Sequence, residues 1–596
     1  MKVANAPGAR MTLVRWRFWV ALSAIACCFA EMPIFPLREV RTGQHGVGRT
    51  VLQGNKISEF QVEILGVLEN IGPKQSIIIG RLSGAGLENA GVLEGMSGSP
   101  VYIDGRLMGA VALAFPFSKE PIAGIRPIED MLPKAGLPSK QALAPPQLFT
   151  PDLTAAVRAA DTVGLGDTRM VPISTPVSFN GFTERTIQYF TPQLKRLGLE
   201  PRQGLSGGGR PATMGNPADL RPGDMISVQL LSGDMSVGAD GTVTAIDGKR
   251  IYAFGHQFLS VGDTELPFAR ADVITILPNY QASFKISTAR QWMGTILQDR
   301  STAVSGELGR RADTAPIAID LTGANGGTAH YNMRTVNDPV LSPLLLQIAV
   351  FSVIDATERT FGASTFNIYG QVDFEGSVTP LRVDNTFAGD FAVPQQASLA
   401  IASPLAYALA AGFKALRIRD IRLNVRSDER KRTLQIDQIS ASRRSVRPGE
   451  GLDVTVGLVG ENGREELKTA HFNVPIGARA GAVQFTVSDA VTTNLLNYAQ
   501  TIGLAPKSPA QVLSFLNDLR PNTKAYVRMW TTDPAYQVQG ADLPDPPPSL
   551  ALILARSQGA PGALSLLRGS GLGEREIDGG DNVITGSKTV QVEVQE

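Results

Sequence analysis

Short apolar runs separated by turn residues recur along most of the chain, and they restrict the folds that it can adopt. Runs such as FQVEILGVL (60–68) and SIIIGRL (76–82) have the length of a β-strand and end at turn signals. The pairs Asp104-Gly105 and Asp247-Gly248 each stand between two such runs, where they favour type I′ hairpins because both residues tolerate a positive φ. Charged residues make up only 19% of the chain, against about 25% in typical domains. The sequence therefore predicts a mainly β protein.

The chain is too long for a single hydrophobic core, since it has 596 residues and domains usually contain about 100–200. Changes in composition predict seven segments. These are a signal peptide (1–30), a first β unit (31–135), a linker with a mixed α/β segment (136–219), a second β unit (220–320), a β-rich accessory domain (321–435), an Ig-like β-sandwich (436–490) and a C-terminal α/β tail (491–596).

The N-terminus has the order of a secretory signal peptide. A basic lead (residues 2–17) precedes the apolar run FWVALSAIACCFA (18–30), which is shorter than the ~20 residues that span a bilayer. Both cysteines, Cys27 and Cys28, lie in this run, so we expect a mature chain without thiols or disulfides. Acylation of Cys27 is the less favoured alternative, because Ala24 replaces the usual leucine. We expect export to the periplasm, the cell envelope or the exterior.

Charge and residue counts argue against several classes of partner. Lys plus Arg (56) balances Asp plus Glu (55), which gives no electrostatic footprint for nucleic acid. The four histidines show no metal-ligand spacing, and no glycine-rich run completes a nucleotide-binding motif. After the signal peptide no apolar run is long and unbroken enough to cross a membrane. We therefore expect no metal, no cofactor and no integral membrane segment.

Ser97 stands out in the stretch GVLEGMSGSPVYIDG (91–105). Gly95 and Gly98 on either side allow a sharp turn, which would expose the hydroxyl and aim the amides of Gly95 and Ser97 at one point. Two such N–H groups form an oxyanion hole. An ordinary turn that feeds the following hairpin accounts for the same residue types.

His256 is the candidate general base. It lies in AFGHQFL, at the end of a run with strand character, and Asp263 follows in the next loop. A histidine activates a serine hydroxyl only within hydrogen-bond reach, about 2.6–3.2 Å. A packed or solvent-facing histidine is the alternative interpretation.

The motifs GMSGSPVYIDGRLMGAVA, IAGIRPIEDML and GKRIYAFGHQFL resemble those of the stage IV sporulation protein B (SpoIVB) peptidase family, and the resemblance covers 38–135 and 220–315. That family consists of serine endopeptidases with a chymotrypsin-like double β-barrel. The resemblance implies that the two β units are the serine-bearing and histidine-bearing barrel halves. It also implies that Ser97 is the nucleophile, His256 the general base, and the amides of Gly95 and Ser97 the oxyanion hole.

Two features depart from the family pattern. Here the serine precedes the histidine in the chain, which is a permuted order, and triads are defined by geometry rather than by chain order. The family acid lies about fifteen residues before the serine, where this chain offers Ser83. Asp263 or Asp104 would then orient the imidazole, or the site is a dyad.

The sequence thus predicts an exported serine endopeptidase that acts on protein or peptide substrates. Because the family processes itself, the chain's own linker is an expected substrate. The segment RSVRPGEGLDVTV (444–456) resembles the accessory region of larger exported bacterial proteins, which implies substrate or surface binding. The alternative function is a catalytically degenerate, peptidase-like scaffold that binds protein or polymer in the cell envelope.

Overall fold

The computed structural model describes most of the chain between residues 32 and 595. The described residues are 32–72, 75–132, 148, 163–165, 168–204, 213–259, 261–280, 282–357, 362–377, 379–501, 506–531, 535–538, 541–543, 547–556, 564–567 and 569–595. The predicted signal peptide, with Cys27 and Cys28, and most of the predicted linker lie outside them. Among the described residues, no helix combines the length and the apolar character needed to cross a membrane.

The first barrel consists of six antiparallel strands in the order β4-β1-β2-β3-β6-β5, and the pairing of β5 with β4 closes it. Alternate apolar side chains point inward and form one buried core. The strands are β1 (His45–Gln53), β2 (Lys56–Gly72), β3 (Gln75–Ser83), β4 (Pro100–Ile103), β5 (Arg106–Ala114) and β6 (Ile122–Pro127). The flanking elements are η1 (Leu37–Glu39), α1 (Leu87–Ala90), α2 (Ile128–Met131), β7 (Val163–Leu165) and β8 (Thr168–Pro172).

The second barrel also has six antiparallel strands, in the order β12-β13-β16-β15-β14-β11, and the pairing of β11 with β12 closes it. The strands are β11 (Met225–Gly233), β12 (Ser236–Asp247), β13 (Arg250–Ala253), β14 (Gly262–Leu277), β15 (Phe284–Arg300) and β16 (Ala303–Leu308). Before it come β9 (Thr175–Asn180), α3 (Glu184–Arg196), β10 (Leu199–Gln203) and η2 (Pro217–Asp219), and β9 extends the sheet beside β12. The two closed barrels confirm the predicted mainly β, chymotrypsin-like double-barrel class.

One of the two predicted hairpin turns is confirmed. In the β4–β5 turn, Asp104 and Gly105 have φ values of 50° and 74°, as a type I′ turn requires. The type I′ turn predicted at Asp247-Gly248 is wrong by one residue. Asp247 pairs with Arg250, which leaves Gly248-Lys249 as the turn, and only Gly248 has a positive φ (57°).

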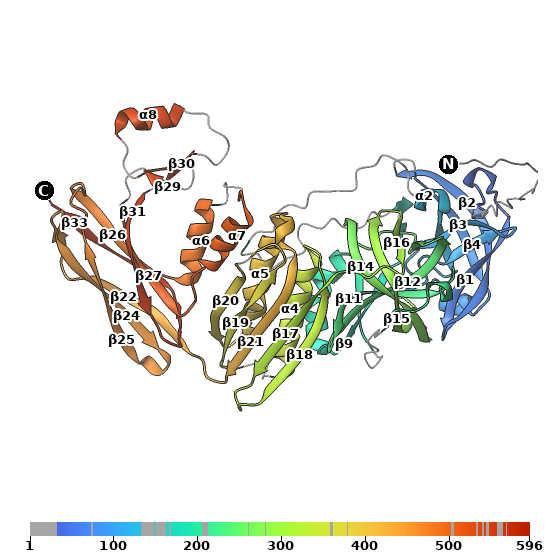
Figure 1. The fold of residues 1–596 in the computed structure, drawn as a ribbon, viewed down its shortest axis with the longest axis horizontal. Coiled ribbons are helices and arrows are strands. Elements are labelled where there is room, and N and C mark those ends of the chain that lie inside the picture. Colours follow the sequence, from blue (N-terminus) through green and yellow to red (C-terminus); the bar gives the residue numbers. More distant parts are fainter. Residues whose placement is uncertain are drawn as a thin grey trace, which may run out of the picture.

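The barrels lie side by side at one end of an elongated molecule (Figure 1). Gly54, after β1, exchanges two backbone hydrogen bonds of 2.7 Å with Val273 of β14. Small apolar clusters combine side chains of both barrels, for example Val51 with Met225 and Val273. Burial of such shared apolar surface holds the two barrels together.

Beyond the second barrel, its sheet continues through β18 into a layer of strands covered by two helices. This part contains β17 (Thr314–Thr322), β18 (Thr328–Val336), α4 (Leu341–Thr357), β19 (Ser364–Phe374), β20 (Leu381–Gly389), α5 (Val393–Ala410), η3 (Lys414–Leu416) and β21 (Ile418–Asp428). Most of α4 is buried, which explains why its sequence is apolar on all sides.

A β-sandwich forms the other end of the molecule (Figure 1). One sheet has the order β25-β24-β22-β32 and the other β23-β33-β26-β27-β31. The strands are β22 (Thr433–Ala441), β23 (Ser445–Val446), β24 (Gly451–Gly460), β25 (Glu465–Asn473), β26 (Gly481–Asp489), β27 (Lys524–Thr531), β31 (Ser570–Asp578), β32 (Val583–Thr585) and β33 (Ser587–Val594). The remaining elements are η4 (Glu461–Gly463), α6 (Ala490–Thr501), α7 (Pro509–Asn517), β28 (Ala535–Val538), β29 (Ala541–Leu543), α8 (Pro548–Arg556) and β30 (Leu564–Leu567). The sandwich thus extends past residue 490 and draws strands from the segment predicted as a separate tail.

Candidate active site

Ser97 lies in a tight turn between α1 and β4, and two glycines shape this turn. Gly95 and Gly98 have φ values of 85° and 92°, in the left-handed region that favours glycine. A Cβ on Gly98 would lie 2.1 Å from the carbonyl oxygen of Thr242 and 2.5 Å from the nitrogen of Phe254. Only glycine lets the serine turn approach the second barrel this closely.

Hydrogen bonds from the second barrel hold the carbonyl groups of the turn. The amide of Thr242 donates to Ser97 O (2.9 Å), and the Thr242 hydroxyl donates to Gly95 O (3.0 Å). The hydroxyl of Thr244 donates to Gly98 O (2.7 Å). With its carbonyls fixed on β12, the turn keeps one conformation.

The amides of Gly95 and Ser97 take no part in these hydrogen bonds. The amides on either side are used, since Met96 N donates to Leu93 O and Gly98 N donates to Val111 O. No residue in the described part of the chain accepts a hydrogen bond from Gly95 N or Ser97 N. These two donors are therefore available to a substrate oxygen, as an oxyanion hole requires.

His256 lies in the segment after β13, where the chain turns through two consecutive left-handed residues. Phe254 and Gly255 both have a φ of 70°, and such a φ at a phenylalanine marks a strained backbone. The ring nitrogen Nδ1 lies 2.6 Å from the carbonyl oxygen of Gln257. Because a carbonyl only accepts, Nδ1 carries the proton and Nε2 is left as an acceptor. This is the tautomer that a general base for serine needs.

The imidazole is neutral at physiological pH. Burial lowers the pKa of His256 to about 4, the hydrogen bond to Gln257 opposes this shift, and the positive charge of Arg126 adds to it. Both effects that lower the pKa disfavour the charged ring. At neutral pH Nε2 is therefore a free base.

The serine and histidine turns meet at one carbonyl of β5. Gly98 N donates to Val111 O (2.7 Å), and a Cβ on Gly255 would lie 3.4 Å from the same oxygen. The side chains of Ser97 and His256 are both buried, with exposed fractions of 0% and 2%. Within the described residues, neither the hydroxyl oxygen nor Nε2 has a hydrogen-bond partner, so the two atoms are not yet bonded to each other. Catalytic hydrogen bonds often tighten only when substrate is present.

The structure does not bring a predicted acid to the imidazole. Asp263 is an exposed residue at the start of β14, where its carboxylate lies 3.5 Å from Nε2 of Gln298. Asp104 is exposed in the β4–β5 turn. Since Nδ1 bonds to Gln257 O, a backbone carbonyl occupies the position that an orienting acid would take.

Asp299 is a carboxylate near this site that the sequence analysis missed. It is buried on β15, and it accepts hydrogen bonds from the amides of Phe258 (2.7 Å), Leu259 (2.6 Å) and Val261 (3.3 Å). It thereby fixes the segment that follows His256. An acid two residues after the end of the apolar run MGTIL (293–297) was the available signal, because a buried carboxylate needs partners.

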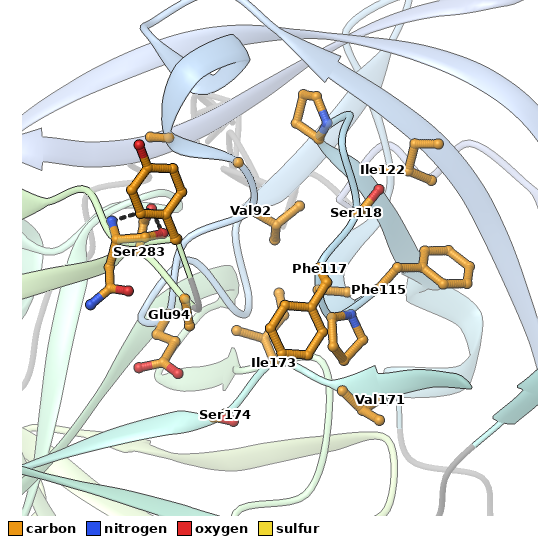
Figure 2. A pocket seen from close by; sticks show the side chains of 18 of the residues that line it. Val92, Glu94, Phe115, Phe117, Ser118, Ile122, Val171, Ile173, Ser174 and Ser283 are labelled. Carbon is orange, nitrogen blue, oxygen red and sulfur yellow. Dashed lines mark hydrogen bonds between the residues drawn. The ribbon is translucent and has the colours of Figure 1, made fainter. Parts of the chain in front are cut away.

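A pocket of about 410 Å³ opens beside the serine turn. Figure 2 shows Val92, Glu94 and Ser283 on one side of it, and Phe115, Phe117 and Ile122 on the other. The first side includes the segment that leads into Ser97, and the second is the β5–β6 loop.

Comparison with known proteins agrees with the geometry of the first barrel. Residues 25–132 match the SpoIVB peptidase S55 family, a range that includes the serine turn but not the histidine-bearing barrel. No curated protein matches the chain. The match supports a serine peptidase that acts on protein substrates.

Proposed function

We propose that the chain is an exported serine endopeptidase with Ser97 as nucleophile and His256 as general base. The observation that carries the proposal is the meeting of two turns at Val111 O. One turn holds a serine beside two unengaged amides, and the other holds a neutral histidine whose Nε2 is an acceptor. Nucleophile, base and oxyanion donors are the parts that acyl transfer requires.

The reaction follows from these groups. Nε2 of His256 takes the hydroxyl proton of Ser97 as Oγ attacks the peptide carbonyl, and the amides of Gly95 and Ser97 hold the oxyanion. The imidazolium then gives its proton to the leaving amine, the C–N bond breaks and an acyl-enzyme remains. Water attacks this ester with His256 again as base, which releases the acid and restores the serine.

The backbone carbonyl of Gln257 takes over part of the role of the third catalytic residue. It keeps the proton on Nδ1, so the imidazole has the productive tautomer without an acid. A neutral carbonyl stabilises the imidazolium less than a carboxylate does, and the charge of Arg126 opposes the imidazolium further. We therefore expect slower turnover than a complete triad gives.

The alternative is the catalytically degenerate scaffold. Its supporting observation is the complete burial of Ser97, because a substrate must displace the covering segments before attack. Export rests on the charge and apolar order of residues 1–30, and self-processing on the Pro- and Ala-rich linker after the first barrel. Export and self-processing are therefore parts of the proposed function.

The experiment is active-site labelling of the full chain with a fluorophosphonate probe, which reacts with activated serines. We expect labelling of the wild type and loss of it in Ser97→Ala and His256→Ala. Ser58→Ala on β2 and the exposed His330→Ala are matched controls that keep labelling.

Labelling that survives Ser97→Ala would assign the nucleophile to another serine. A folded wild type that neither labels nor cleaves a peptide library would favour the scaffold. Cleavage of the linker in the wild type but not in Ser97→Ala, followed by mass spectrometry, tests self-processing.

A further inference from the structure

The pocket lies beside the segment that leads into the proposed oxyanion hole. Gly91, Val92 and Glu94 line it, and Glu94 immediately precedes Gly95. Three residues of extended chain span at most about 11 Å, so Glu94 lies within this distance of Ser97. A peptide carbonyl held by the two amides therefore has its own side chain near the pocket.

The walls of the pocket combine polar and apolar side chains. Val92 and Ile173 lie within it, and Phe117 faces them from the β5–β6 loop (Figure 2). At the rim stand two exposed aromatic rings from different barrels, Phe117 (77% exposed) and Tyr280 (106% exposed). Exposed aromatic side chains beside a concave site are typical of ligand-binding surfaces. The apolar part of the wall suits the methylene stem of a long side chain.

A buried carboxyl group, that of Glu94, lines this pocket. Glu94 is only 6% exposed, and its Oε2 accepts a hydrogen bond from Arg202 on β10 (3.1 Å). Burial nevertheless raises the pKa of Glu94 to about 7, against the opposing effect of Arg202. One guanidinium thus fails to compensate the buried carboxylate, and the site is short of positive charge.

The other charged groups of the lining add to this shortage. Carboxyl groups outnumber cationic groups there by four to two: Glu88, Glu94, Glu120 and Glu200 against Lys119 and Arg202. Two of these carboxylates already pair with cations outside the lining, Glu120 with Arg81 and Glu200 with Lys195. A second cation that enters the pocket would therefore meet Glu88 and Glu94.

We propose that this pocket binds the side chain of the substrate residue that precedes the scissile bond, and that it selects lysine or arginine. The inference rests on the proposed function, because it assigns specificity to that same site. The stem of the substrate side chain packs on Val92, Phe117 and Ile173, and its cation pairs with Glu94.

The preference depends on pH, because the carboxyl of Glu94 must be ionised to attract a cation. The charged groups that face it are Arg202 and Glu200 on β10 and Lys195 on α3. Since the pKa of Glu94 is raised to about 7, the carboxylate is present above that pH and is lost as the pH falls through it. A bound cation stabilises the carboxylate and moves the midpoint below 7.

The test is hydrolysis of fluorogenic peptides by the full chain, with Lys, Arg, Leu or Glu before the scissile bond. We expect a preference for Lys and Arg in kcat/KM that grows as pH rises through about 7. Glu94→Gln should reduce this preference about 10- to 100-fold, the value of a charge-assisted hydrogen bond. Glu59→Gln makes the same chemical change on β2, outside the pocket, and keeps the preference.

Arg202→Gln supplies a test of opposite sign. Removal of the resident guanidinium leaves Glu94 without its partner and raises the pKa of its carboxyl further. The preference for Lys and Arg should therefore increase only at a pH well above 7, where the carboxyl is ionised, whereas a purely structural role would not raise it. Thermal unfolding of each variant verifies that it is folded.

The two proposals fail in different ways. Fluorophosphonate labelling of Ser97 without a preference for basic residues, or with a preference that Glu94→Gln leaves unchanged, would overturn the specificity and leave the peptidase. Cleavage only at residues other than lysine and arginine would likewise overturn the specificity and leave the peptidase. Absence of both labelling and hydrolysis in the folded wild type would overturn the proposed function, and the specificity with it.

Discussion

Substitution of Gly98 tests the close approach of the serine turn to the second barrel. Gly98→Ala adds a Cβ 2.1 Å from the carbonyl oxygen of Thr242, a backbone atom that cannot rotate away. The substitution also forces alanine to a φ of 92°. The left-handed backbone costs about 1–2 kcal/mol, and the overpacking typically costs about 1–3 kcal/mol. The variant should therefore lose about 2–5 kcal/mol of stability where the barrels meet.

Gly43→Ala is the matched control, because it separates the effect of the backbone from that of the contact. Gly43 precedes the same barrel and has a φ of 84°, but a Cβ there has nothing within 4 Å. It should show only the cost of the left-handed backbone. The difference between the two variants, about 1–3 kcal/mol, measures the contact with the second barrel.

The measurement is differential scanning calorimetry of the full chain, together with the rate of fluorophosphonate labelling. Several domains unfold in one scan, so the quantity to compare is the midpoint of the barrel transition and not a two-state free energy. We expect this midpoint to lie about 3–10 °C lower in Gly98→Ala than in Gly43→Ala. Labelling should also be strongly reduced, because the displaced turn moves Ser97 away from His256. Equal midpoints and equal labelling rates in the two variants would refute the reasoning.

Three further predictions concern the histidine and the contacts that hold the site. The labelling rate should fall only as the pH drops through about 4, because the pKa of His256 is lowered to about 4 and the base acts when it is unprotonated. Arg126→Gln should move the pH midpoint of labelling upward. A wild-type midpoint near the ordinary histidine pKa of about 6.5 would contradict the buried neutral ring. Asp299→Asn keeps one acceptor oxygen for three amides, so labelling should slow about tenfold or more while its pH midpoint stays unchanged. A variant that labels at the wild-type rate would refute the positioning role of Asp299. Thr242→Val removes the hydroxyl that donates to Gly95 O and leaves a buried carbonyl without a partner, so it should destabilise the protein by about 1–3 kcal/mol. Thr242→Ser keeps the hydroxyl and should restore stability and labelling.

The sequence predicted the elements whose signals are local. The type I′ turn at Asp104-Gly105 follows from two adjacent residues that accept a positive φ, and the glycines around Ser97 have the positive φ that a sharp turn needs. Helix α4 was not predicted because its run is apolar on all sides, and such a run lacks the periodicity that separates a buried helix from a strand. The predicted sandwich boundary at 490 is too early because β27 and β31 pair across a connection of 38 residues (532–569), a distance at which no local pattern indicates a partner.

The contacts of His256 likewise could not be predicted from local sequence patterns. The expected partner of Nδ1 was an acid, since an acid is a residue type that can be read from the sequence. The group at that position is the carbonyl of Gln257, which every residue carries, so no pattern could have indicated it. Asp299 acts on the backbone after the ring and not on the ring itself, so spacing from His256 gives no sign of its role.

The chain order of Ser97 and His256 matters less than the way in which the barrels meet. Three carbonyls of the serine turn are held by Thr242 and Thr244 of the second barrel, and the buried lysine of β15, Lys285, donates from Nζ to the hydroxyl of Thr50 in the first barrel (2.7 Å). The first barrel supplies the serine and the proposed oxyanion amides, and the second barrel supplies donors to three carbonyls of the same turn. Docking of the barrels therefore brings the segment of His256 to the serine turn and also helps to set the geometry of that turn. Any permutation of the chain that preserves this interface would preserve the site, which is why a serine motif ahead of the histidine motif is compatible with catalysis.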